Sequence, residues 1–138
     1  LDTPDPYLAF SERVSLAKLA LARFFEEAKT DGRTVAALGA STKGNVLLQY
    51  CGLSSEDIVA VGEVNPDKVG CFTPGTWIPI VPEAHLLRSK PDYLLVLPWH
   101  FRDFFLNNTR FKGMRMVFPL PNMEIVCGKS IAAPADNP

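Results

Sequence analysis

The sequence predicts an α/β fold of the Rossmann-like, three-layer type, with a mostly parallel sheet and an additional long N-terminal helix. Short, almost continuously apolar segments, clearest at 34–39, 57–64 and 92–98, are typical of strands buried on both faces. Segments with helical character lie between several of these strands, and this alternation indicates a parallel sheet covered by helices on both sides.

The N-terminal region predicts a linker followed by a long helix. Residues 1–8 contain two prolines and two aspartates without a regular period, so we assign them to a linker. Ser11 is a suitable N-cap for the helix, and Gly32 ends it. Apolar residues at steps of three and four give this helix one apolar face: Val14, Ala17, Leu21, Phe24 and Phe25.

Residues 9–128 form a single predicted domain. We expect further helices at 44–52, 82–90 and 100–113, and further strands at 77–81, 114–120 and 123–127. Residues 65–76 are rich in proline and glycine, so the crossover between the second and third strands should contain no helix. Residues 129–138 lack apolar periodicity, and we predict a flexible tail.

Composition narrows the class of protein. A hydrophobic fraction of 47% and a charged fraction of 21% in 138 residues indicate one globular domain. The net charge of −1 gives no reason to expect nucleic acid, and the apolar runs are too short to span a membrane. We therefore expect a cytoplasmic protein. Because the chain begins with Leu1, we also expect it to be part of a longer protein.

Three widely spaced cysteines, Cys51, Cys71 and Cys127, form no C-x-x-C pair. Their odd number and spacing argue against a disulfide scaffold and against a zinc site, and they suit a reducing compartment. We expect Cys51 and Cys127 to be buried and inert.

The loop after the first predicted strand is the leading candidate site, because ligands of open parallel sheets bind at the carboxyl ends of the strands. Its glycines allow a tight turn and close approach to a ligand, while amides at the start of the next helix favour an anion. A lysine and two hydroxyls add a charge and donors. A plain turn capped by Ser or Thr is the alternative. The candidates are Gly39, Ser41, Thr42, Lys43, Gly44 and Asn45.

Three known loop types do not fit this segment. A Walker loop requires lysine after its last glycine, where Asn45 stands. A dinucleotide loop requires a second glycine where Ala40 and Ser41 stand, although Glu63, at the end of the second strand, is placed to hold ribose hydroxyls. A methyl-donor loop usually has an acid at the end of its first strand, and Ala37-Leu38-Gly39 has none. We do not expect S-adenosylmethionine at this loop.

Two further segments should border the same edge of the sheet. The crossover contributes Asn65, Lys68, Thr73 and Gly75 as candidates for one wall. Trp99, after the third strong strand, suits either stacking on a flat ring or packing in the core. His100 has no visible carboxylate or nucleophile as a partner, so we predict no catalytic residue here and no metal site.

Four segments occur in an order that resembles the C-terminal domain of sugar C-methyltransferases: GASTKGNVLLQYCGL, EVNPDKVGCFTPGTWIPIV, KPDYLLVLPWHFRD and MVFPLPNMEIV. The resemblance extends from about Tyr7 to Cys127. It implies a longer protein with a zinc-binding N-terminal module and a central S-adenosylmethionine domain. It also implies that this domain holds a nucleotide-activated deoxysugar, typically a dTDP-sugar, and that neither zinc nor the methyl donor binds to this chain.

The resemblance also implies roles for single residues. Ser41, Lys43 and Gly44 would face the phosphate or the sugar. The residues that match family positions in the crossover and at the strand end are Asn65, Lys68, Thr73, Pro74, Gly75 and Trp99. Two residues depart from the family's pattern, because Glu63 stands where aspartate is frequent and His100 where asparagine is common.

Two other functions suit the same sequence. A crossover without a helix also occurs in Rossmann domains that bind coenzyme A, so the domain could be a non-catalytic module for coenzyme A or a dinucleotide. Alternatively, it could be a structural domain whose long helix packs against a catalytic domain or a second subunit. In each case we expect the chain alone to be inactive, because it lacks both a methyl-donor motif and a convincing base.

Overall fold

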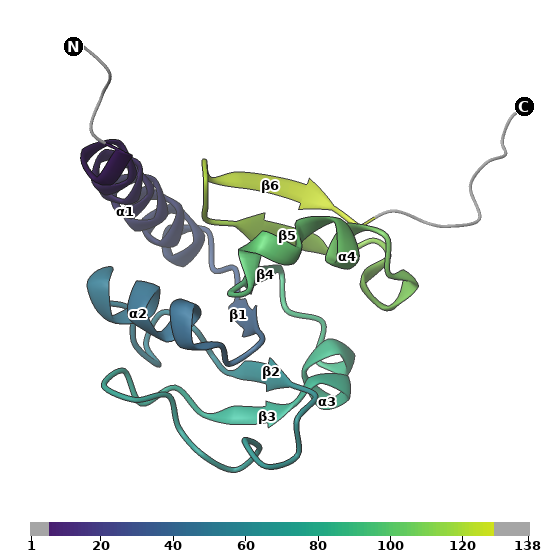
Figure 1. Ribbon diagram of the computed structural model, residues 1–138. Helices are drawn as coiled ribbons and strands as arrows, with labels where there is room; N and C mark the ends of the chain where they lie inside the picture. Colours follow the sequence, from purple (N-terminus) through teal and green to yellow (C-terminus); the bar gives the residue numbers. More distant parts are fainter. Residues whose placement is uncertain (1–5, 129–138) are drawn as a thin grey trace, which may run out of the picture.

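The computed structural model describes residues 6–128, with side chains from residue 12 onward, and shows one six-stranded sheet with helices on both faces (Figure 1). The strands are β1 (Val35–Leu38), β2 (Val61–Glu63), β3 (Ile80–Pro82), β4 (Tyr93–Val96), β5 (Arg115–Phe118) and β6 (Glu124–Cys127). The helices are α1 (Pro6–Thr30), α2 (Thr42–Tyr50), α3 (Glu83–Arg88) and α4 (Arg102–Leu106), with 3-10 turns η1 (Trp99–Phe101) and η2 (Thr109–Phe111). None of the helices among these residues is long and apolar enough to cross a membrane.

The sheet is doubly wound. Its strand order is β3-β2-β1-β4-β5-β6, with β1 to β5 parallel and β6 antiparallel to β5 at the edge. The chain thus builds outward from β1 to β3 and then returns to add β4 on the other side of β1. The order of strands reverses between β1 and β4, which is where open α/β sheets bind their ligands.

Alternate residues of the central strand face different helical layers. Val35 and Ala37 pack with α1 and α2, whereas Ala36 and Leu38 pack with α3 and α4. A strand covered on both faces has no polar side, which explains its continuous apolar sequence. The predicted three-layer architecture and its mostly parallel sheet are therefore confirmed.

The long helix is also confirmed, but its start differs from the prediction. It begins at Pro6, five residues before Ser11, so residues 6–8 are helical rather than part of a linker. Proline is favoured in a first helical turn, because amide hydrogens there have no acceptor within the helix and proline, which lacks one, loses no hydrogen bond. On the predicted apolar face, Val14 is half-buried and the other members are buried: Ala17, Leu21, Phe24 and Phe25.

Other boundaries differ as well. The predicted helix 100–113 is broken into η1, α4 and η2, and the side chain of Asn108 accepts a hydrogen bond from the amide of Arg110 at the second break. Cys127 is exposed, against our expectation, because it lies on the edge strand β6. The crossover from β2 to β3 contains no helix, as predicted. The predicted tail, 129–138, lies outside the described residues.

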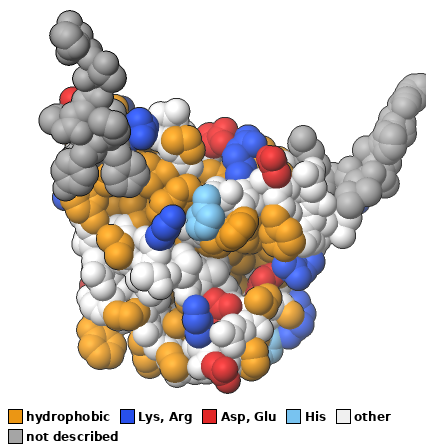
Figure 2. All heavy atoms as spheres, in the orientation of Figure 1, with side chains coloured by type: hydrophobic (Ala, Val, Ile, Leu, Met, Phe, Trp, Pro, Cys, Tyr) orange, Lys and Arg blue, Asp and Glu red, His pale blue; other side chains and the backbone are white. Residues whose placement is uncertain are grey.

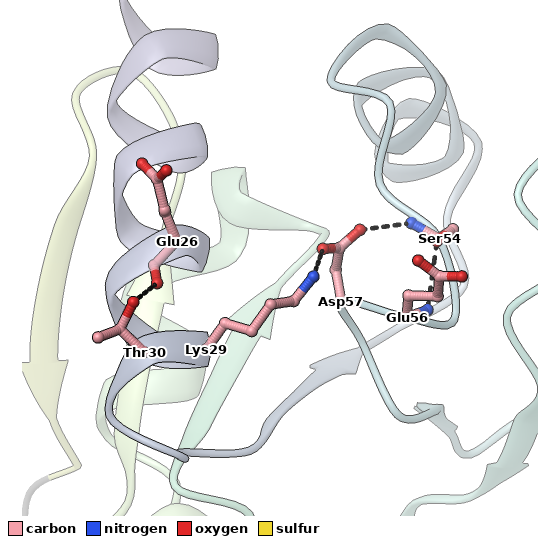
Figure 3. A network of polar contacts seen from close by, with 6 residues as sticks. All are labelled: Glu26, Lys29, Thr30, Ser54, Glu56 and Asp57. Carbon is pink, nitrogen blue, oxygen red and sulfur yellow. Dashed lines mark hydrogen bonds and ion pairs between the residues drawn. The ribbon is translucent and has the colours of Figure 1, made fainter.

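The C-terminal end of α1 is joined to the segment that follows α2 (Figure 3). Lys29 Nζ lies 3.5 Å from Asp57 Oδ1, and Asp57 Oδ2 accepts a hydrogen bond from the amide of Ser54. Because the lysine is largely exposed, this pair contributes little to stability and mainly orients the two segments.

Candidate ligand-binding site

A cavity of about 310 Å³ opens at the carboxyl ends of β1, β2 and β4, at the reversal of strand order. Its volume is at the lower end of the range of ligand pockets, roughly 300–1,000 Å³. We call it the Glu83 cavity. Its main lining residues are Gly39, Ser41, Glu63, Lys68, Glu83, Phe101, Phe104 and Arg110.

Two of the predicted site residues hold the backbone of the glycine loop. Glu63 Oε1 accepts a hydrogen bond from the amide of Ala40 at 2.7 Å, and Lys68 Nζ donates one to the carbonyl of Ala40 at 2.7 Å. Glu63 Oε2 accepts two more, from the amides of Val64 and Asn65. Both Glu63 carboxylate oxygens are thus engaged with the backbone of the chain itself.

The turn has a conformation and a packing that require glycine at two positions. Gly39 has φ +80°, and a Cβ there would lie 2.8 Å from Pro98 Cδ. A Cβ on Gly44 would lie 2.5 Å from Leu97 Cβ, so α2 packs closely on the end of β4. Ser41 is the N-cap of α2, since its hydroxyl accepts a hydrogen bond from the amide of Gly44 at 3.1 Å.

Glu83 is a site residue that we did not identify in the sequence. Its side chain is 10% exposed, and Arg110 Nε lies 3.3 Å from Oε2 without forming a hydrogen bond. Burial raises the pKa of Glu83, the guanidinium of Arg110 opposes this, and the carboxylate of Glu63 adds to it. The sequence did contain a signal, because Glu83 directly follows β3 at the carboxyl edge of the sheet.

A second cavity lies on the other side of the loop. This groove, about 430 Å³, is mostly apolar and lies between α1 and α2; we call it the α1–α2 groove. Figure 2 shows hydrophobic side chains gathered on this face near α1 and α2 and again near α4, with charged side chains between them. The groove is lined by Val14, Thr42, Lys43, Val46, Leu47, Tyr50, Trp99 and Leu120.

The loop 39–45 therefore divides the predicted residues between two cavities. Gly39 and Ser41 border the Glu83 cavity together with Glu63 and Lys68. Thr42 and Lys43, with Trp99, border the α1–α2 groove. Trp99 also packs against both halves of the core, so it contributes to packing as well as to the groove.

Asn45 and His100 flank this region. Asn45 is half-buried in α2, and its Oδ1 is buried without a hydrogen-bond partner among the described residues. The exposed imidazole of His100 lies beside the rings of Trp99 and Phe101. The described contacts of His100 are thus with aromatic rings, and no carboxylate is among them.

The remaining candidates have structural contacts. Asn65 Oδ1 accepts a hydrogen bond from the amide of Asp67 within the crossover turn. Thr73 is buried, and its hydroxyl accepts a hydrogen bond from the amide of Ile78. Gly75 has φ +77° and lies against the side chain of Gln49. These contacts shape the crossover, and none of the three residues lines the Glu83 cavity.

An open, doubly wound sheet with helices on both faces defines a Rossmann-like α/β domain, and its cavity lies where such sheets bind their ligands. Within the described residues, no group of three or more His, Cys, Asp or Glu side chains is placed to hold a metal ion.

Residues 1–121 match the family described as the C-methyltransferase C-terminal domain, and the chain belongs to this family. The chain is also similar to C-methyltransferase NovU of Streptomyces niveus, with 34% identity over 103 residues, covering 72% of this chain. The matched region is 24% of that relative, so the chain spans about a quarter of its length.

Proposed function

We propose that this domain binds the nucleotide-activated deoxysugar substrate of an S-adenosylmethionine-dependent C-methyltransferase. The ligand is a dTDP-sugar or a close analogue. The catalytic domain of the same protein, outside this chain, binds the methyl donor, and a further module binds zinc. Family membership supports this division, and so does the lack of an acid at the end of β1, where a methyl-donor site usually has one.

One observation carries the proposal: the start of α2, whose chemistry suits an anion, lies between two cavities. The first backbone hydrogen bond of α2 runs from Asn45 N to Ser41 O. The amides of Thr42 and Lys43 precede it, so they have no acceptor within the helix and are directed out of its start. The exposed ammonium of Lys43 adds a positive charge there. A nucleotide sugar has the same arrangement, with a diphosphate between two uncharged rings.

Binding of dTDP to the 138-residue chain tests the proposal by titration calorimetry. We expect heat and a stoichiometry near one, whereas coenzyme A and NAD should produce neither. No heat with dTDP at millimolar concentration would contradict a direct role in binding. Stabilisation by coenzyme A or NAD alone, in a thermal-shift assay, would favour a module for another nucleotide.

The role of Lys43 is tested in the full-length enzyme. Lys43→Ala should raise the KM for the sugar nucleotide about fivefold with little change in kcat, because one exposed charge contributes about 1 kcal/mol. Lys112→Ala is the matched control, since this exposed lysine lies beyond η2 and lines neither cavity. An unchanged KM for Lys43→Ala would remove Lys43 from the site.

A further inference from the structure

We propose that the Glu83 cavity holds the base of the nucleotide, with the carboxyl group of Glu83 accepting a hydrogen bond from a ring N–H and Phe101 and Phe104 packing on the ring. The diphosphate then lies outside this cavity, at the start of α2. This inference builds on the proposed function, because it assigns one end of the nucleotide sugar to one of the two cavities.

The charges of the cavity do not suit a phosphate. Two carboxyl groups, Glu63 and Glu83, line it and would repel an anion. Both lining cations already have partners, since Lys68 donates to the carbonyl of Ala40 and Arg110 pairs with Glu83. An uncharged group that donates hydrogen bonds is the chemistry that this balance favours.

Glu83 is the acceptor that such a group would find. Among the described residues, Arg110 is its ionic partner, yet no donor makes a hydrogen bond to its buried Oε2. A buried acceptor without a donor is unfavourable, and a ligand N–H would correct this. The pairing of a carboxyl group with a ring N–H also gives selectivity for bases that carry one.

The rim of the cavity provides aromatic surface. Phe101 is 57% exposed and Phe104 is 55% exposed, and both line the cavity together with its polar side chains. Phe105, behind them, is buried and contacts the rings of Phe104 and Phe111, which fixes the position of this layer. Exposed rings beside a polar cavity suit stacking on a flat ring.

The same features favour the base over the sugar. A sugar carries polar groups around most of its ring, whereas this cavity combines one carboxyl group that lacks a hydrogen-bond donor with two phenylalanine rings. A base is flat and apolar on both faces, and its donors are at one edge. Placement of the base here leaves the sugar at the other end of the ligand, on the far side of the loop 39–45.

Ligand fragments test this assignment by NMR on the ¹⁵N-labelled 138-residue chain. Thymidine should shift the amide signals of Gly62 and Val64, and inorganic pyrophosphate should shift those of Thr42 and Lys43. N3-methylthymidine lacks the ring N–H and should bind at least tenfold more weakly than thymidine. The assignment is overturned if a free 6-deoxyhexose shifts Gly62 and Val64 while thymidine does not, or if pyrophosphate shifts them most.

Two variants extend the test to dTDP. Glu83→Met removes the acceptor at nearly constant volume and should lower dTDP affinity at least tenfold. Phe104→Ala should lower it about fivefold, and this exposed position keeps the test valid if Glu83→Met fails to fold. Phe72→Ala is the matched control, because Phe72 is 54% exposed and lies outside the cavity.

The outcomes separate this inference from the proposed function. If dTDP binds neither the wild-type chain nor the variants, both fail. If dTDP binds the wild-type chain, Glu83→Met and Phe104→Ala with equal affinity, only the assignment of the base to this cavity fails.

Discussion

The carboxylate of Glu63 accepts a hydrogen bond from the amide of Ala40, 2.7 Å away and 23 residues earlier in the chain. Lys68 donates a hydrogen bond to the carbonyl of the same residue. The amide and the carbonyl of Ala40 are thus both held by side chains, one from β2 and one from the crossover. The glycine loop is therefore held by side chains from neighbouring elements as well as by its own turn.

Loss of this contact should destabilise the fold. Glu63→Ala removes the acceptor for three backbone amides, and we expect the free energy of unfolding to fall by about 2 kcal/mol in urea titrations. Glu26→Ala, at an exposed position of α1, is the control and should change it by less than about 0.5 kcal/mol. Equal effects of the two substitutions would show that Glu63 does not hold the loop.

Gly44→Ala should destabilise the domain although alanine favours helices. Helix propensity alone predicts a gain of about 1 kcal/mol, but the new Cβ would lie 2.5 Å from Leu97 Cβ. We expect the contact to prevail, with a net loss of about 1–3 kcal/mol in urea unfolding.

Gly52→Ala separates packing from backbone strain. Gly52 has φ +67°, and a Cβ added there would meet none of the described residues within 4 Å beyond its chain neighbours. The substitution should therefore cost only the strain, about 1–2 kcal/mol.

A gain in stability for Gly44→Ala would show that α2 can move away from β4.

The sequence predicted the parts of this structure that depend on local pattern. Continuous apolar runs gave β1 and β4, and the step of three and four residues gave the buried face of α1. Prolines and glycines in 65–76 indicated the crossover without a helix. In each case the signal lies in neighbouring residues, because burial on both faces leaves a continuous apolar run, burial on one face of a helix leaves a period, and turn residues indicate a loop.

The contacts of the site depend on tertiary structure and were not visible. The strand-end position of Glu63 was visible in the sequence, but not that its oxygens accept hydrogen bonds from the amide of a loop 23 residues away and from its own strand end. Glu83 was not identified as a site residue, since its burial depends on Arg110 and on the packing of α3 against β2. Asn108 interrupts a helix that the apolar pattern alone would continue.

The raised pKa of Glu83 makes the stability of the domain depend on pH. Burial favours the protonated carboxyl group, so the folded state binds more protons than the unfolded state above the ordinary glutamate pKa of about 4.3. The free energy of unfolding should therefore fall as the pH rises through the interval between that value and the raised pKa. Glu83→Gln cannot ionise and should lack this decline.

The measurement is the difference in unfolding free energy between wild type and Glu83→Gln at a series of pH values. We expect wild type to lose stability relative to the variant as the pH rises from about 4. A difference that grows in favour of wild type over this range would show that the pair with Arg110 outweighs burial.

Burial also raises the pKa of the Cys51 thiol, against the smaller effect of the nearby Lys18 ammonium. Cys71 and Cys127 are exposed. Iodoacetamide at pH 8 should therefore modify Cys51 at least tenfold more slowly than the other two, as measured by peptide mass spectrometry over time. In urea the three rates should become similar, and a fast reaction of Cys51 in the folded chain would contradict its half-buried position.

Asp92 should stabilise the start of β1 only while it is ionised. Its Oδ2 accepts a hydrogen bond from the backbone amide of Thr34 at 2.7 Å and another from the Thr34 hydroxyl at 3.2 Å. The hydrogen bond from the backbone amide is the main cause of the lowered pKa of Asp92. The contribution is complete above the unfolded pKa of about 3.9 and is lost as the pH falls through the lower folded value. Wild type should thus exceed Asp92→Asn in urea midpoint at pH 6, and the difference should shrink below about pH 4. Thr34→Val keeps the hydrogen bond from the backbone amide and should retain most of this pH dependence. Complete loss of the pH dependence in Thr34→Val would assign the effect to the hydroxyl.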